Sequence, residues 1–261
     1  MPEKIPTTET EQTKAKGEIQ LEQVAELEAP IKKIIEKIKN RIENGEYGLI
    51  IGDDASARIP TRILGDFIRE ISRIRGQLQP NIIFIPGKLK GGWLELAEQE
   101  QFEEHISKFG MVPDKKILII TDTVFSGESL QKLVHLIKKA GHIPEIATIG
   151  QEFNGPFGHP EKMAEENLEG AEIISGEYEA TKERQKETGW AHTPQIYKRE
   201  DFSGVYKVSD ELKSRRAIDD WSISPERKIM TKENINDSRK DAKIMTKKLV
   251  DWYESQKQDE K

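Results

Sequence analysis

The chain has 261 residues, a net charge of −6, a hydrophobic fraction of 35% and a charged fraction of 34%, which suits a soluble globular core with polar extensions. It contains no cysteine, which excludes disulfides and thiolate metal sites, and no apolar run approaches the roughly 20 residues that span a bilayer. The negative charge disfavours a broad nucleic-acid surface and the N-terminus lacks the order of a secretion signal, so we expect a cytoplasmic protein without nucleic-acid or membrane partners.

The first expected elements follow a polar N-terminal segment. Met1–Glu28 is rich in Glu, Thr, Lys and Gln without a sustained apolar period, and we predict a disordered tail. Isoleucines at positions 31, 34, 35, 38 and 42 then lie on one helical face, which ends at Asn44-Gly45. The short apolar run Gly48–Gly52 is typical of a buried strand, and a helix is expected from about Pro60.

The same alternation continues through the middle of the chain. Apolar runs of strand length recur, separated by segments with helical periodicity. The further strands are expected at Asn81–Pro86, Ile117–Asp122 and Ile143–Ile149, and the helices between them at Trp93–Phe109 and Leu130–Ala140. Strands that alternate with helices indicate an α/β fold with a mainly parallel sheet flanked by helices.

Beyond Gly150 the pattern is weaker. Short strands are expected at Ala171–Ser175 and Gly204–Val208, and a closing helix at Asn234–Tyr253. The polar segment Gly176–Asp201 is open to three interpretations, a surface excursion, a lid or a small hood over a site. The predicted division is a tail (1–28), an α/β core (29–150), a hood or lid region (151–208) and a C-terminal helical segment (209–261).

The stretch from Lys116 to Leu130 is the part of the sequence that points to chemistry. An apolar strand ends in Asp122, a short loop of hydroxyls and one glycine follows, and an amphipathic helix begins. A phosphate is bound by converging backbone N–H groups, hydroxyls and a helix N-terminus, and Ser126–Ser129 can supply all three. The acid one loop away suits the hydroxyls of a sugar, so the pattern predicts a site for a phosphorylated ribose.

This stretch resembles the phosphoribosyl-pyrophosphate signature of type I phosphoribosyltransferases. The signature has four apolar residues, two acids, an apolar residue, two variable residues, Thr-Gly, one variable residue and Thr. The four apolar residues are matched by Ile117–Ile120, the second acid by Asp122, Thr-Gly by Ser126-Gly127 and the closing Thr by Ser129. The resemblance implies a type I phosphoribosyltransferase-like fold with a small hood and C-terminal helices.

The resemblance also implies roles for individual residues. Asp122 and Asp54 are the candidate catalytic residues and the candidate ligands of Mg²⁺, the expected cofactor. The candidate ligand-binding residues are Thr121, Asp122, Thr123, Ser126, Gly127, Glu128, Ser129, Asp53, Ala55, Ser56, Arg58 and Lys88. The expected ligand is a phosphorylated ribose, either phosphoribosyl pyrophosphate or a nucleotide, and a homodimer is one option for the assembly.

The leading functional hypothesis is transfer of phosphoribosyl to an unidentified nitrogen acceptor with release of pyrophosphate. The alternative is a non-catalytic nucleotide or phosphoribosyl-pyrophosphate sensor on the same fold. Thr121 stands where the family has its first acid, and Gly87–Asp114, where the family has a basic mobile loop, is largely acidic. Both departures favour the alternative. A phosphatase or kinase of another α/β family is a third option, for which no motif is present.

Simpler interpretations stay open for each feature. Thr121–Ser129 could be an ordinary strand–turn–helix junction capped by Ser126. The acids Asp53 and Asp54 could be turn residues, and Lys88 could lie in a solvated loop. The five histidines show no spacing that suits a zinc site.

Overall fold

The computed structural model describes residues 17–53, 55–85, 96–111, 114–152, 160–189, 191–194, 205–207, 214–216 and 224–259. Its centre is a five-stranded, wholly parallel sheet with the order β2-β1-β3-β4-β5. The strands are β1 (Tyr47–Asp53), β2 (Asn81–Ile85), β3 (Lys116–Val124), β4 (Pro144–Gln151) and β5 (Glu172–Ser175). The expected α/β class and the parallel sheet are therefore confirmed.

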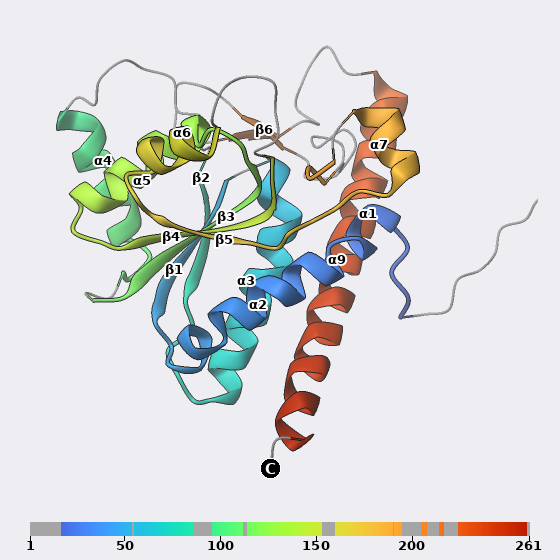
Figure 1. The fold of residues 1–261 in the computed structure, drawn as a ribbon, viewed down its shortest axis with the longest axis horizontal. Coiled ribbons are helices and arrows are strands. Elements are labelled where there is room, and N and C mark those ends of the chain that lie inside the picture. Colours follow the sequence, from blue (N-terminus) through green and yellow to red (C-terminus); the bar gives the residue numbers. More distant parts are fainter. Residues whose placement is uncertain are drawn as a thin grey trace, which may run out of the picture.

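Helices cover both faces of the sheet (Figure 1). One face packs against α2 (Glu28–Glu43), α3 (Arg58–Ile74) and α9 (Pro225–Asp259). The other packs against α4 (Leu96–Ser107) and α5 (Glu128–Lys139), with α6 (Pro160–Asn167) beside α5. Because both faces are buried, the strands are apolar on both sides, and this explains the continuous runs at Leu49–Ile51 and Ile117–Ile120.

The remaining elements are short. They are α1 (Glu22–Ala25), the 3₁₀ turn η1 (Ala55–Ala57), α7 (Lys182–Thr188) and an antiparallel pair of strands, β6 (Val205–Lys207) and β7 (Ser214–Arg216). Of these, only β6 was predicted from the sequence, as a strand at Gly204–Val208.

The N-terminal segment and the closing helix both differ from expectation. Val24 and Leu27 are buried in the core, so the expected disordered tail does not extend to Glu28, while residues 1–16 lie outside the described residues. The fully buried carboxylate of Asp241 on α9 accepts the backbone N–H groups of Gln20 and Leu21 at 2.8 and 2.7 Å. That contact joins the start of α1 to α9, which itself begins at Pro225, earlier than the expected Asn234.

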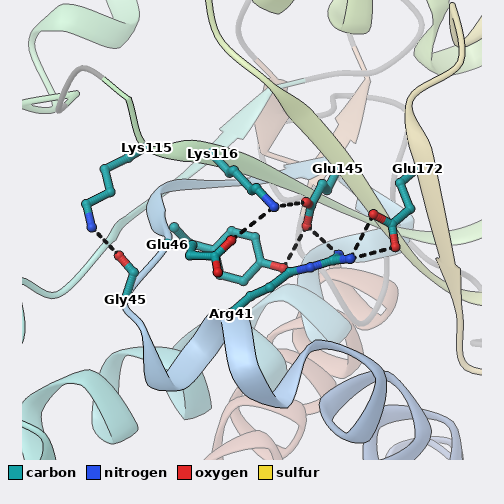
Figure 2. A network of polar contacts seen from close by, with 8 residues as sticks. Arg41, Gly45, Glu46, Lys115, Lys116, Glu145 and Glu172 are labelled. Atoms are coloured by element: carbon teal, nitrogen blue, oxygen red, sulfur yellow. Dashed lines mark hydrogen bonds and ion pairs between the residues drawn. The ribbon is translucent and has the colours of Figure 1, made fainter.

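The amino ends of the strands carry an ionic network around one buried carboxylate (Figure 2). Its centre is Glu145, whose Oε2 accepts hydrogen bonds from Arg41 Nη1 at 2.9 Å and from the Tyr47 hydroxyl at 2.8 Å. The other oxygen pairs with Lys116 Nζ at 2.7 Å, and Arg41 also binds Glu172. Burial raises the pKa of the Tyr47 hydroxyl, which keeps this group a hydrogen-bond donor. The network joins α2 to the amino-terminal ends of β3 and β4.

Candidate functional site

The strand order fixes where a ligand is expected. From β1 the chain passes through α3 to β2 on one side, and it then returns to β3 on the other side of β1. Ligands of open parallel sheets bind beyond the carboxyl ends of the strands at such a switch point. The carboxyl ends of β1 and β3 carry Asp53 and Thr121–Thr123, so the structure brings the two candidate loops to one edge.

A direct hydrogen bond joins these two strand ends. The Thr121 hydroxyl donates to Asp53 Oδ2 at 3.2 Å, and both residues are almost fully buried. In the register Gly52 lies opposite Ile120, so the next residue of each strand is a neighbour. Two residues earlier, Ile51 and Ile119 belong to the core on the α5 face, and the alternation of a strand places Asp53 and Thr121 on that face.

The second acid, Asp122, is also buried but lies on the other face. The preceding even-numbered residues Leu118 and Ile120 pack in the core formed with α3, so alternation directs Asp122 toward the α3 side. The strand continues to Val124, two residues beyond its predicted end. Asp122 is therefore placed at the switch point, and Thr121 and Asp122 face opposite sides of the sheet.

The loop after β3 leads into a helix N-terminus that has no side-chain cap. Gly127 is the N-cap of α5 with φ 74°, a left-handed conformation that favours glycine. Its carbonyl accepts the N–H groups of Leu130 and Gln131, whereas the N–H groups of Glu128 and Ser129 belong to the first turn, where helices lack internal acceptors. No side-chain cap occupies the N-cap position, so the simpler interpretation of a helix capped by Ser126 is wrong.

Other candidate residues of this loop differ in exposure. Ser126 and Ser129 are half-buried and Glu128 is exposed, which is consistent with a carboxylate that points away from a phosphate. The Thr123 hydroxyl oxygen is buried without a hydrogen-bond partner among the described residues. Such a group costs free energy unless a ligand or water binds it.

The loop between β1 and α3 is only partly described. Ser56 is buried in η1, which also contains Ala55, while Asp54 and Lys88 lie outside the described residues. Arg58 begins α3, and its guanidinium lies 4.4 Å from the centre of the Phe84 ring at the end of β2. A cation at a helix N-terminus opposes the helix dipole, and the aromatic face offsets that cost.

Three residues near this edge were not predicted from the sequence, namely Thr61, Arg62 and Phe84. Arg62 lies 5.7 Å from the same Phe84 ring. The Thr61 hydroxyl is buried without a hydrogen-bond partner among the described residues. Arg62 could have been found from its spacing, because it lies one helical turn after Arg58. The roles of Phe84 and Thr61 depend on contacts between elements, and no local pattern marks them.

The segment after β5 lies against the carboxyl end of β4. The N–H groups of Gly176 and Tyr178 donate to the carbonyls of Thr148 and Ile149, and the His192 N–H donates to Glu152 Oε2 at 3.0 Å. A Cβ added to Gly150 would lie 1.7 Å from the His192 carbonyl oxygen. Gly176, Tyr178 and His192 thus lie at the carboxyl end of β4, the strand next to the one that carries Thr121.

The expected magnesium site depends on the acids at this edge. In the described part of the chain, no group of three or more His, Cys, Asp or Glu residues could hold a metal. Magnesium sites at phosphates often use only one or two carboxylates, with waters and phosphate oxygens as the other ligands. Asp122 offers one buried carboxylate at this edge, and Asp54 lies outside the described residues, so magnesium stays a prediction.

A separate cavity of about 600 Å³ lies between α3 and α9. Charged side chains of both signs line it, among them Asp66, Arg69 and Lys243. None of the residues predicted for the site is part of this lining, so we place the candidate site at the switch point on chemical grounds.

Among the described residues, no helix is both long and apolar enough to cross a membrane.

Comparison with known proteins gives one informative similarity. Over 109 residues the chain is 27% identical to the transcriptional regulator GfcR of Methanobrevibacter smithii. The aligned residues cover 41% of this chain and 50% of that protein. The chain thus spans about half the length of this relative. No family model matches the chain, and no solved structure matches it.

The similarity overturns the leading functional hypothesis. Transfer of phosphoribosyl to a nitrogen acceptor is the wrong expectation, because the relative is a regulator of transcription. The regulatory alternative fits better. It also agrees with Thr121, which stands in the place of an acid and directs its hydroxyl to Asp53.

Proposed function

We propose that this chain is a regulatory protein that binds a phosphorylated ribose at the β1/β3 switch point and does not transfer it. The ligand class is phosphoribosyl pyrophosphate or a nucleotide, and the fold is of the type I phosphoribosyltransferase kind. The observation that carries the proposal is the meeting of Asp53 and Thr121 in one buried hydrogen bond, beside a glycine-capped helix N-terminus. It combines an acidic edge for sugar hydroxyls with N–H donors for a phosphate.

Each group has a distinct role in this proposal. The Asp122 carboxylate accepts hydrogen bonds from the ribose hydroxyls, and the N–H groups and hydroxyls of Ser126–Ser129 bind the 5′-phosphate. Arg58 at the start of α3 contributes positive charge for a second phosphate group. If magnesium accompanies the ligand, Asp122 and Asp54 would hold it together with phosphate oxygens; the ion would neutralise phosphate charge.

The sensing role is supported by what Thr121 does. Its hydroxyl carries no charge and is hydrogen-bonded to Asp53, so this edge lacks the adjacent pair of acids in the family signature. The similarity to a transcriptional regulator supports the same conclusion. The net charge of −6 disfavours direct contact with nucleic acid. We therefore assign this chain the sensing of a ligand in the cytoplasm.

Isothermal titration with phosphoribosyl pyrophosphate, with and without Mg²⁺, tests the proposal. We expect binding by the unaltered chain and an affinity at least about tenfold lower for Asp122→Asn, because a hydrogen bond to a charged group is lost. Asp251→Asn, an exposed acid on α9, is the matched control and should bind normally. Absence of binding at millimolar ligand, or equal binding by Asp122→Asn, would contradict the site.

A second measurement separates sensing from catalysis. Pyrophosphate release is assayed with a panel of bases and amines as acceptors, and no turnover is expected. Measured turnover would contradict the regulatory assignment even if the ligand binds as proposed.

A further inference from the structure

We propose that Asn167, the last residue of α6, is a positioning residue that orients the phosphate loop of the β1/β3 site. This inference rests on the proposed function and adds a part of the molecule that no sequence pattern connects with the site. Asn167 does not belong to the loop, and it lies 41 residues from Ser126 in the sequence. It acts through the Ser126–Gly127 peptide.

The first observation is the direction of one peptide group. The Asn167 side-chain amide donates to the Ser126 carbonyl oxygen at 2.8 Å, so this carbonyl is directed toward α6. In a trans peptide the carbonyl and the following N–H point in opposite directions, and cis peptides are absent from the described residues. The N–H of Gly127 is therefore directed away from α6.

The sheet order shows what lies in that direction. Helix α6 connects β4 to β5, and both strands lie on the opposite side of β3 from β1. Figure 1 shows α6 beside α5 above this part of the sheet. An N–H that points away from α6 is thus directed toward the side of β1, where Asp53 and the switch point lie. The Gly127 N–H is therefore the donor of the phosphate loop whose direction is set by the contact with α6.

The second observation concerns the position of Gly127 itself. A Cβ added to Gly127 would lie 2.8 Å from the Cγ of Leu168, a fully buried residue that directly follows Asn167. Leu168 therefore packs against the Cα of Gly127 while Asn167 holds the adjacent carbonyl. Two consecutive residues at the end of α6 fix both the place and the orientation of this part of the loop.

The third observation is that the turn after α6 is itself held by α5. Glu169 Oε1 lies 2.7 Å from His135 Nδ1, and Lys138 Nζ donates to the Glu169 carbonyl. Both partners belong to the helix whose N-terminus forms the phosphate loop. The loop, α5 and the turn after α6 thus form one closed set of contacts, and the loop is preorganised before a ligand arrives.

The test uses ribose 5-phosphate as the probe and three variants of the full chain. Asn167→Ala removes the donor, and Asn167→Asp places a carboxylate, which cannot donate, against a carbonyl oxygen. Glu166→Ala, an exposed neighbour on the same helix, is the matched control. From the net value of one hydrogen bond we expect Asn167→Ala to bind about three- to tenfold more weakly, Asn167→Asp more weakly still, and the control to bind normally.

A spectroscopic readout distinguishes positioning from a general loss of structure. In the unaltered chain the Gly127 amide proton should shift downfield on addition of ribose 5-phosphate, because this N–H donates to the phosphate. In Asn167→Ala at saturating ligand that shift should be lost. The melting temperature of this variant should equal that of the unaltered chain, and Asp122→Asn should still weaken its binding of the ligand.

If the unaltered chain binds and both Asn167 variants bind equally well with the same Gly127 shift, the positioning role is overturned and the proposed function stands. If the unaltered chain binds no ribose 5-phosphate and no phosphoribosyl pyrophosphate, the proposed function itself fails.

Discussion

The hydroxyl of Thr121 and the carboxylate of Asp53 form a 3.2 Å hydrogen bond between the carboxyl ends of β3 and β1. Both side chains are almost fully excluded from solvent, so the bond joins the two strands at the switch point of the sheet. Asp53 has a further interaction besides this one. The position that carries an acid in the phosphoribosyltransferase signature is thus a structural partner of the neighbouring strand.

Replacing Thr121 by valine should therefore destabilise the fold. The shape is preserved, but a buried carboxylate oxygen loses a donor, and we expect a loss of about 1–3 kcal/mol in the free energy of unfolding. Thr121→Ser keeps the hydroxyl and loses one methyl group, so it should cost only about 1 kcal/mol. Urea denaturation of both variants measures the difference. Equal stability of the valine and serine variants would show that the hydrogen bond contributes nothing.

The sequence predicts the sheet well because its strands are buried on both faces. Runs such as Ile117–Ile120 are continuous and apolar, and the helices between them keep a 3.6-residue period. The predictions were wrong where such a signal is absent. The four residues of α1 are too few to show a period, and the first turns of α9 bury Thr231 and leave Ile229 exposed.

The site was predictable only where its residues are neighbours in the sequence. Asp122 and Gly127 belong to one strand–loop–helix unit, and the spacing within that unit is what led to the roles proposed for them. Phe84 and Asn167 come from other elements, and their positions depend on how β2 and α6 pack. Local patterns carry no information about such contacts, since they arise only when the chain has folded.

Gly127 should not tolerate a side chain. Its φ of 74° would cost an alanine about 1–2 kcal/mol, and the added Cβ would lie 2.8 Å from Leu168 Cγ. Gly141→Ala is a matched control at the other end of α5, because Gly141 has φ +81° with nothing within 4 Å of an added Cβ. We expect Gly127→Ala to be the more destabilising substitution in thermal denaturation. Equal effects of the two would mean that Leu168 moves aside at no cost.

The buried carboxylate of Glu145 should be the most sensitive position of the network in Figure 2. Glu145→Gln leaves Arg41 and Lys116 without their shared buried carboxylate, and we expect a loss of about 3 kcal/mol. Glu172→Gln removes another acid that pairs with Arg41, but its side chain is 53% exposed, so the cost should be below about 1 kcal/mol. Chemical denaturation of the two variants makes the comparison. A Glu172→Gln variant as unstable as Glu145→Gln would contradict the assignment of the buried carboxylate as the centre of the network.

Acid should weaken the fold in part through Glu46. A hydrogen bond from Lys116, at 3.0 Å, holds the pKa of this carboxyl below its ordinary value of 4.5. A carboxyl whose pKa is lower in the folded chain stabilises the fold above the unfolded pKa, and this contribution is lost as the pH falls through the folded pKa. Between roughly pH 5 and pH 3 the free energy of unfolding should thus fall less steeply in Glu46→Gln than in the unaltered chain. Urea denaturation across this range gives both profiles, with the exposed Glu165→Gln as a control that should follow the unaltered chain. Superimposable profiles for Glu46→Gln and the unaltered chain would show that the Lys116 contact does not stabilise the ionised form.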